Sequence, residues 1–530
     1  MRKFLNWIDE IAHINQESVI AKWLERIAFI FLILMIVCAP HSIAATQIAW
    51  LSGMLAWAIR LFIKPRPKFF RTSLDVALWA LAGWSVVTAL CSYAPDISLD
   101  KLRGVGLFLI FYFIINNLRT KRAAIFLAGA LIFSSMVSVI WTPIERIIGR
   151  GVEISGVKSD SPLSKAVMVE DSAVEGFAVK GYIRGDDTLL EANKKKIRDP
   201  AQLIDEIEKN EITRVKVARL DYTYTLEVRR DELLPGNSAI EQLGFESWKR
   251  NRSWRAAGFY GAFITFAEVL QLILSLTFGI FIVFLQNKNN PNSESQILDF
   301  KSKIQNPQSK ILLGFCVLAM MFALLLTATR ASQAGFMVSA FVITWLGASR
   351  KIFWTLMAIA LPLALICLLF LQQYRNVSFF DSSDNSTTWR ETVYREGFDL
   401  WTKSARNFTV GVGMDSIKRF AKDWHLFDDG RLPMGHFHST PLQLAVERGL
   451  PALLIWLWIL FIYAKTLWKG FNSQIQNPKS KIQNGIVLGC LGGLVGFFTS
   501  GLVHYNLGDG EVAMAFYILM GLSVFLAVKK

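Results

Sequence analysis

Apolar residues in this chain fall into blocks of about 20 residues that are separated by polar segments. As a helix, a block of this length crosses the roughly 30 Å hydrocarbon core of a bilayer. The blocks predict about twelve membrane spans. They lie near residues 25–40, 45–63, 73–92, 103–118, 123–142, 262–286, 311–328, 333–348, 353–373, 441–466, 485–503 and 511–528. The pattern therefore predicts an α-helical polytopic membrane protein.

Two long polar segments, 143–258 and 374–440, interrupt the apolar blocks and suggest a division into five parts. The expected parts are spans one to five (20–145), a small folded α+β insert (146–232), spans six to nine (250–373), a large loop (374–440) and spans ten to twelve (441–530). Within the insert, alternating residues over 214–219 and 222–228 predict a β-hairpin. Asp199 before Pro200 predicts the capped start of a helix that extends to Ile207.

The formal net charge of +15 is concentrated in short loops between the expected spans. Basic side chains cluster at Lys64, Arg66, Lys68, Arg71, Arg119, Lys121, Arg122, Arg350, Lys351, Lys465, Lys469, Lys479, Lys481, Lys529 and Lys530. All these loops have the same parity along the chain, so the positive-inside rule places them and both termini in the cytoplasm. The two long polar segments are then external. Cytoplasmic loops therefore account for the positive net charge, and we do not expect nucleic acid binding.

Composition limits the other chemistries. Hydrophobic residues make up 53% of the chain, and the five cysteines lie singly in or beside apolar blocks, which indicates packing rather than disulfide bonds or metal binding. No acidic pair lies at a membrane edge in the spacing that holds a metal, so neither a metal nor another cofactor is expected. Residues 1–20 are polar and amphipathic, so no cleavable signal peptide is expected.

Three polar side chains lie at predicted external edges of the membrane. His438 stands at the start of the span near 441–466, where an imidazole can act as a general base or, with Ser439, simply cap the helix. Arg330 ends the span near 311–328, where a guanidinium requires an anionic partner or reaches lipid phosphate. Arg390 lies in a helix-like run and could be an anion ligand or a solvated arginine.

Together these pieces resemble the O-antigen ligase and polymerase superfamily. Its ligase motif is a His, then Asn, Ser or Gln, nine residues, Gly, two residues, and finally Gly, Thr or Tyr. His438, Ser439 and Gly449 match this motif in register, whereas Ala452 stands at its last position and departs from it. The segments around Arg330 and Arg390 are similar to the arginine elements of the family, in the same order.

The resemblance implies transfer of a glycan from a polyprenyl diphosphate to an acceptor hydroxyl, at the external face of the bacterial plasma membrane. His438 would be the catalytic base, and Arg330 and Arg390 would bind the diphosphate without a metal, with inversion at the sugar. Ser439, Glu447 and Gly449 would support the site. The expected partners are the lipid-linked glycan, a glycan or lipid acceptor, and membrane lipids. Two alternatives stay open: a polysaccharide polymerase of the same superfamily, and a protein associated with transport of bicarbonate or another solute.

The insert resembles a bacterial PDZ domain. The similarity lies in segments 159–166, 185–197 and 215–228, and the departures are an insertion over 167–184 and a short first strand. By this resemblance Gly149, Arg150 and Gly151 would form the loop that holds a peptide carboxylate with backbone amides. The alternative is a structural spacer without a peptide or protein ligand.

Overall fold

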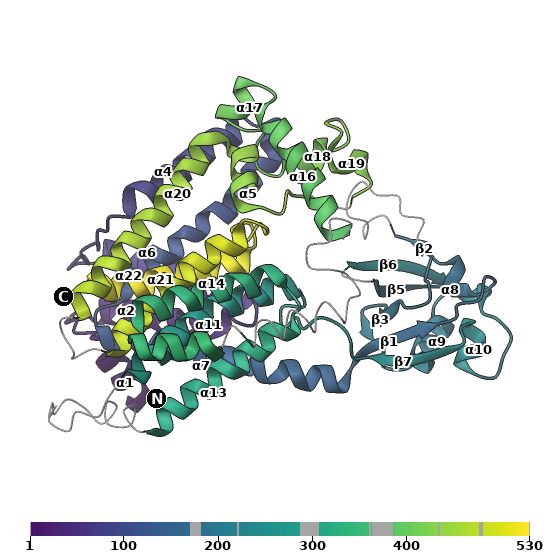
Figure 1. Cartoon of the computed structure of the whole chain (residues 1–530), viewed down its shortest axis with the longest axis horizontal. Coiled ribbons are helices and arrows are strands. Elements are labelled where there is room, and N and C mark those ends of the chain that lie inside the picture. The colour runs from purple at the N-terminus through teal and green to yellow at the C-terminus, as the bar shows by residue number, and fades with distance from the viewer. Residues whose placement is uncertain are drawn as a thin grey trace. The chain divides into compact units, whose positions relative to one another are not determined.

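The computed structural model describes residues 2–169, 182–219, 222–286, 307–359, 362, 385–432, 435–475 and 481–528. The chain forms two compact units. One unit comprises Met1–Ile140, Ala256–Ile417 and His436–Lys530, and in the described residues it is built from helices (Figure 1). The other comprises Trp141–Arg255 and Lys418–Gly435 and contains a β-sheet.

The helices of the first unit come from both ends of the chain. The amino-terminal set is α1 (Arg2–Ala12), α2 (Val19–Cys38), α3 (Ile43–Phe62), α4 (Asp75–Leu90), α5 (Pro95–Val105), the 3₁₀ turn η1 (Gly106–Phe108), α6 (Leu109–Asn117) and α7 (Lys121–Ile148), whose last turns enter the second unit. The later set is α11 (Phe263–Leu285), α13 (Pro307–Leu326), α14 (Arg330–Gly347), α16 (Asn385–Thr402), α17 (Ala405–Thr409), α20 (Thr440–Ile475), α21 (Lys481–Gly501) and α22 (Gly510–Val528). The short helices α18 (Ser416–Phe420) and α19 (Leu426–Gly430) lie between α17 and α20 in the sequence.

Six helices of the described residues are long and apolar enough to cross a membrane: α7, α11, α13, α20, α21 and α22. They coincide with expected spans and make the chain a multi-pass membrane protein. The spans expected near 25–40, 45–63 and 333–348 form the helices α2, α3 and α14, which are not among the six. The span expected near 103–118 is divided between α5, η1 and α6, and most of the one near 353–373 lies outside the described residues. The number twelve therefore stays a prediction.

Helices α11, α14 and α21 pack closely because small residues meet at their crossings (Figure 1). A Cβ on Gly279 of α11 would lie 2.3 Å from Cα of Gly489 on α21, so neither position accepts a larger residue. On α14, Gly335 faces Gly496 and Gly347 faces Leu488, so α14 and α21 run antiparallel. The beginnings of α11 and α14 and the end of α21 consequently lie at the same end of the bundle.

A buried carboxylate near the start of α2 is matched by two guanidinium groups. Glu25 is 7% exposed, and its Oε1 accepts a hydrogen bond from Nε of Arg60 at 2.9 Å and lies 2.7 Å from Nη2 of Arg119. A buried charge without a partner would cost several kcal/mol, so this ion-pair cluster allows Glu25 to be buried in the helical unit. It joins α2, the end of α3 and the residues before α7.

The second unit is a seven-stranded antiparallel sheet. Its strands are β1 (Arg150–Ser155), β2 (Val167–Met168), β3 (Thr188–Ala192), β4 (Lys195–Lys196), β5 (Ile212–Arg219), β6 (Tyr222–Arg229) and β7 (Ser247–Asn251), in the spatial order β2-β6-β5-β3-β1-β7, with β4 paired to β3. The helices α8 (Pro162–Lys165), α9 (Pro200–Lys209) and α10 (Ala239–Leu243) and the 3₁₀ turn η3 (Arg230–Glu232) accompany it. The predicted hairpin is confirmed as β5–β6, and Asp199 caps α9 by accepting a hydrogen bond from N of Gln202 at 3.0 Å.

The sheet extends beyond residue 232, the limit expected for the insert, because β7 pairs with β1. This pairing bears on the expected peptide-binding loop. Gly149 and Gly151 have positive φ, and Arg150 between them pairs with Asn251 of β7. On its other side β1 pairs with β3, so it has no free edge to which a peptide could add as a strand. Capture of a peptide by this loop stays a prediction that the strand order does not favour, and residues 170–181 of the expected insertion lie outside the described residues.

Candidate active site

His438 lies in the short loop before α20 and is surrounded by aromatic rings. Its backbone adopts a left-handed conformation (φ 49°), which is uncommon for a residue with a side chain. The ring centroid is 5.1 Å from that of Trp389 in an edge-on arrangement and 4.0 Å from that of His436. The backbone N–H of His438 donates a hydrogen bond to Nδ1 of His436 at 3.2 Å. These contacts fix the direction of the imidazole.

Helix α16 brings a cation to this imidazole. The guanidinium of Arg390 lies 4.6 Å from the ring centroid of Trp389, the residue whose ring also contacts His438. One turn further, the hydroxyl of Tyr394 donates to the backbone oxygen of His438 at 3.3 Å. One face of α16 thus carries Trp389, Arg390 and Tyr394, which puts two of the predicted site residues, Arg390 and His438, in one cluster.

Burial lowers the pKa of His438, and electrostatic interaction with His436, His504 and Arg390 lowers it further, from its ordinary value to about 2. The imidazole is therefore neutral at pH 7 and able to accept a proton. An anion bound against Arg390 would offset part of this positive charge and raise the pKa of His438 again.

The first residues of α20 are tied to the loop between α21 and α22. Thr440 donates from its backbone N and from its Oγ1 to the backbone oxygen of His504, at 3.1 Å in both cases. Its Oγ1 also lies 2.8 Å from Oδ1 of Asn506. The buried Ser439 caps the helix, because its Oγ accepts a hydrogen bond from N of Leu442 at 3.5 Å. The capping role expected for Ser439 is thus present, next to His438 itself.

Glu447 is the centre of a buried hydrogen-bond network about two turns into α20. It is 2% exposed, and its carboxylate accepts from Nε2 of Gln443 at 2.9 Å, from the backbone N of Asp415 at 2.9 Å and from the hydroxyl of Tyr505 at 3.4 Å. The amide oxygen of Gln443 accepts in turn from the backbone N of Phe437 at 2.8 Å. Glu447 therefore supports the loop that carries His438.

Gly449 breaks α20 at a defined point. Its dihedral angles (φ 73°, ψ 177°) lie outside the helical region, and a Cβ at this position would lie 2.1 Å from the backbone oxygen of Thr409. Pro451 follows two residues later and lacks the N–H that a continuous helix would require. The glycine of the sequence motif is thus explained by backbone geometry.

The break exposes two carbonyl groups that accept hydrogen bonds from the segment Gly411–Gly413. The backbone oxygens of Val446 and Glu447 accept hydrogen bonds from N of Val412 at 2.8 Å and N of Gly413 at 2.9 Å. The segment Gly411–Gly413 is thus a turn held against α20 by its backbone amides. It also fixes the polypeptide that follows α17 against the helix that begins next to His438.

A buried acid and a buried histidine, which the sequence reasoning missed, pair at the same end of the bundle. Oε1 of Glu268 on α11 lies 2.6 Å from Nδ1 of His504, and both side chains are less than 10% exposed. Burial of a carboxylate within an apolar block costs free energy, so such a residue is usually paired or functional. Glu268, in the apolar block near 262–286, is the signal in the sequence that indicates a polar site here. The pair anchors the backbone segment that receives Thr440.

Arg330 is the first residue of α14, after a three-residue turn that includes Ala328 at φ 50°. Its side chain is exposed. Helix pairing puts the start of α14 at the same end of the bundle as the start of α11 and the end of α21, which is also the end where His504 contacts the start of α20. The prediction that Arg330 shares a pocket with His438 rests on this common end.

No group of three or more His, Cys, Asp or Glu side chains in the described part of the chain is arranged to hold a metal ion. The polar groups around His438 are aromatic nitrogens, hydroxyls and a guanidinium. This set suits an anionic or hydroxylated ligand.

A family model described as O-antigen ligase matches residues 315–457. The matched segment contains all six predicted transfer-site residues: Arg330, Arg390, His438, Ser439, Glu447 and Gly449. No curated protein matches the chain. The matched domain and the membrane-spanning helices agree with the resemblance seen in the sequence, and they favour a glycosyltransferase of the ligase or polymerase type over a transport-associated protein. Residues 315–457 are therefore similar to the O-antigen ligase family, which supports the O-antigen ligase superfamily for this multi-pass membrane protein.

Proposed function

We propose that the protein transfers a glycan from a polyprenyl diphosphate to a hydroxyl group of an acceptor at the external face of the bacterial plasma membrane. The observation that carries this proposal is the cluster of His438 and Arg390 around Trp389, inside the segment that matches the O-antigen ligase family. The cluster combines a neutral imidazole with a guanidinium, which are the two groups that such a transfer requires.

In the proposed reaction, His438 acts as the general base. The acceptor oxygen attacks the anomeric carbon of the glycan, and the bond between that carbon and the diphosphate oxygen breaks. The hydroxyl proton passes to the imidazole, and the electron pair of the broken bond stays on the leaving polyprenyl diphosphate. A positioned base contributes on the order of 10²–10⁴ in rate. A single displacement of this kind inverts the configuration of the anomeric carbon.

Arg390 and Arg330 bind the diphosphate in this proposal. A guanidinium forms paired, charge-assisted hydrogen bonds to phosphate oxygens and stabilises the charge that develops on the leaving group. Negative charge next to Arg390 also raises the pKa of His438 toward the range in which a base is effective. Binding of the donor and activation of the acceptor are thereby coupled. We propose that no metal takes part, so transfer should continue in the presence of a chelator.

We infer that the His438 end of the bundle is external and that both termini are cytoplasmic. Basic residues lie at the opposite end: Arg350 and Lys351 follow α14, Lys469 lies near the end of α20, and Lys481 begins α21. The positive-inside rule assigns that end to the cytoplasm. A lipid-linked glycan in the outer leaflet would then have its diphosphate at the depth of His438.

The acceptor distinguishes a ligase from a polymerase, and the register of His438, Ser439 and Gly449 favours a ligase. The test is reconstitution of the purified protein in liposomes with a lipid-linked oligosaccharide and separate acceptors: a lipid A core, a soluble glycan and a second lipid-linked oligosaccharide. Product masses report one addition for a ligase and a ladder of additions for a polymerase. Absence of any product with every acceptor, while the donor stays intact, would refute the proposal.

A further inference from the structure

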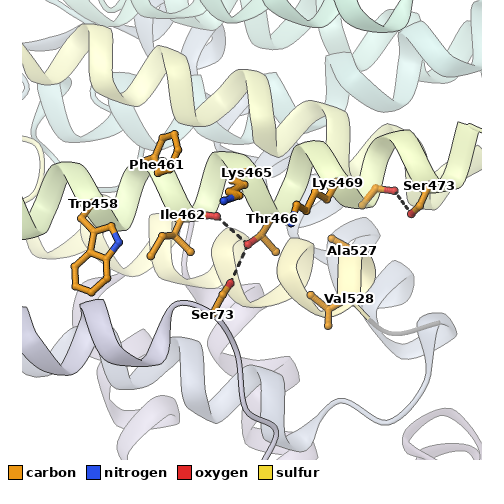
Figure 2. Close-up of a pocket in the computed structure, with 11 residues that line it drawn as sticks. Ser73, Trp458, Phe461, Ile462, Lys465, Thr466, Lys469, Ser473, Ala527 and Val528 are labelled. Atoms are coloured by element: carbon orange, nitrogen blue, oxygen red, sulfur yellow. Dashed lines mark hydrogen bonds between the residues drawn. The ribbon is translucent and has the colours of Figure 1, made fainter.

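A cavity of about 660 Å³ opens along the second half of α20, far along the helix from His438 (Figure 2). It is lined by Ser73, Trp458, Phe461, Ile462, Lys465, Thr466, Lys469, Gly470, Ser473, Ala527 and Val528. These residues come from α20, the end of α22 and the segment before α4. None of them belongs to the proposed transfer site.

The cavity changes from apolar to cationic along the axis of α20. Trp458 and Phe461 lie toward the middle of the helix, and their side chains are 42% and 63% exposed. Lys465 and Lys469 follow at intervals of four residues and therefore lie on the same face, as Figure 2 shows. At 1.5 Å per residue, Trp458 and Lys465 are about 10 Å apart along the axis. This is the polarity profile of a lipid at the edge of a bilayer.

Hydroxyl groups complete the cationic part of the cavity. Oγ of Ser73 and Oγ1 of Thr466 lie 3.1 Å apart, and Oγ of Ser473 donates to the backbone oxygen of Gly470 at 2.9 Å (Figure 2). Among the lining residues in the described part of the chain, two are lysines and none is acidic. The wall of the cavity therefore has a net positive charge.

We infer that this cavity is a binding site for an anionic glycerophospholipid. Lys465 and Lys469 contact the headgroup phosphate, and an acyl chain lies along Trp458 and Phe461. Basic pockets between membrane helices bind anionic headgroups in this way. A free phosphate would leave the aromatic wall unused, so the geometry favours the lipid. The inference is independent of glycan transfer.

The test is native mass spectrometry of the full-length protein in detergent, with phosphatidylglycerol, with phosphatidylcholine of the same acyl chains, and with inorganic phosphate. Phosphatidylglycerol should bind preferentially. The double variant Lys465→Gln, Lys469→Gln should weaken its binding about tenfold or more, since each lysine near a membrane surface contributes roughly 1 kcal/mol. The control variant Arg350→Gln, Lys351→Gln removes two exposed basic residues elsewhere and should bind as the unmodified protein does.

A second variant separates the two parts of the site. Phe461→Ala should weaken binding of phosphatidylglycerol while the preference for it over phosphatidylcholine persists. Equal binding of the two lipids by the unmodified protein would overturn the inference, as would an equal loss in the lysine variant and its control. Binding of inorganic phosphate as strong as that of the lipid would also overturn it. None of these measurements depends on glycan transfer, so a failure here leaves the proposed activity untouched.

Discussion

The ring of Trp389 lies edge-on to the ring of His438, with the two centroids 5.1 Å apart, and its face carries the Arg390 guanidinium. One indole therefore positions both a proton acceptor and a cation. Trp389 and Arg390 are adjacent on α16, whereas His438 precedes α20, so the contact depends on how these two helices pack. The proposed chemistry predicts different consequences for each member of the cluster.

Arg390→Lys should lower kcat/KM for the lipid-linked donor by roughly 10- to 100-fold, because a lysine ammonium replaces the two-pronged guanidinium with a single point charge. Steady-state transfer kinetics at varied donor concentration measure the change. Arg395→Lys is the matched control, since Arg395 is exposed on the same helix. Equal kinetics of the two variants would show that Arg390 does not bind the diphosphate.

Arg330→Lys should impair transfer in the same way if the beginning of α14 contributes to the diphosphate site. Arg350→Lys, beyond the other end of α14, should leave transfer unchanged because it lies at the opposite end of the bundle. The two variants are compared in the same liposomes at saturating acceptor. Wild-type kinetics for Arg330→Lys would assign Arg330 to contact with lipid phosphate instead.

The pH dependence of kcat/KM tests the environment of His438. Its pKa is lowered to about 2, mainly by burial, and a base stays active as long as it is deprotonated. As pH falls from roughly 8 to 5, His438 should therefore cause no loss of kcat/KM, whereas an ordinary histidine would lose about tenfold per unit below roughly pH 6.5. His436→Gln removes one of the neighbouring groups that lower this pKa, so the acidic limb of this variant should move to higher pH. An acidic limb near roughly pH 6.5 in both the unmodified protein and His436→Gln would contradict the lowered pKa of His438.

Much of the site could be predicted from the sequence because its signals are local. The motif that joins His438 to Gly449 reflects a helix start and a helix break, both of which the backbone requires. The cap at Asp199 and the hairpin that follows it are also local, and they were predicted correctly.

The contacts between distant segments could not be predicted in this way. The pairing of Glu268 with His504 joins residues 236 positions apart, and no periodicity in either segment indicates the partner of the other. The additional strand β7 was missed for the same reason, because its pairing with β1 depends on residues about 100 positions apart. Short helices such as α4 and α6 also read as apolar blocks in the sequence, so composition alone does not fix the number of spans.

Gly449→Ala should destabilise the protein by at least about 2 kcal/mol, because the new Cβ meets the Thr409 carbonyl oxygen at 2.1 Å in a backbone conformation that disfavours side chains. Thermal unfolding in detergent, followed by circular dichroism, measures the effect. Gly83→Ala on α4 is the control, since its Cβ would meet no atom within 4 Å and alanine favours a helix. Equal unfolding temperatures for the two variants would contradict the kink observed in α20.

The most direct test of the proposed function is a comparison of donor binding and glycan transfer in His438→Ala. The purified variant, in liposomes with the lipid-linked oligosaccharide and an acceptor, should bind the donor as the unmodified protein does. Its transfer rate should fall on the order of 10²–10⁴-fold. The control His425→Ala changes an exposed histidine and should retain full transfer. Transfer by His438→Ala at the unmodified rate would contradict the proposal that this imidazole activates the acceptor.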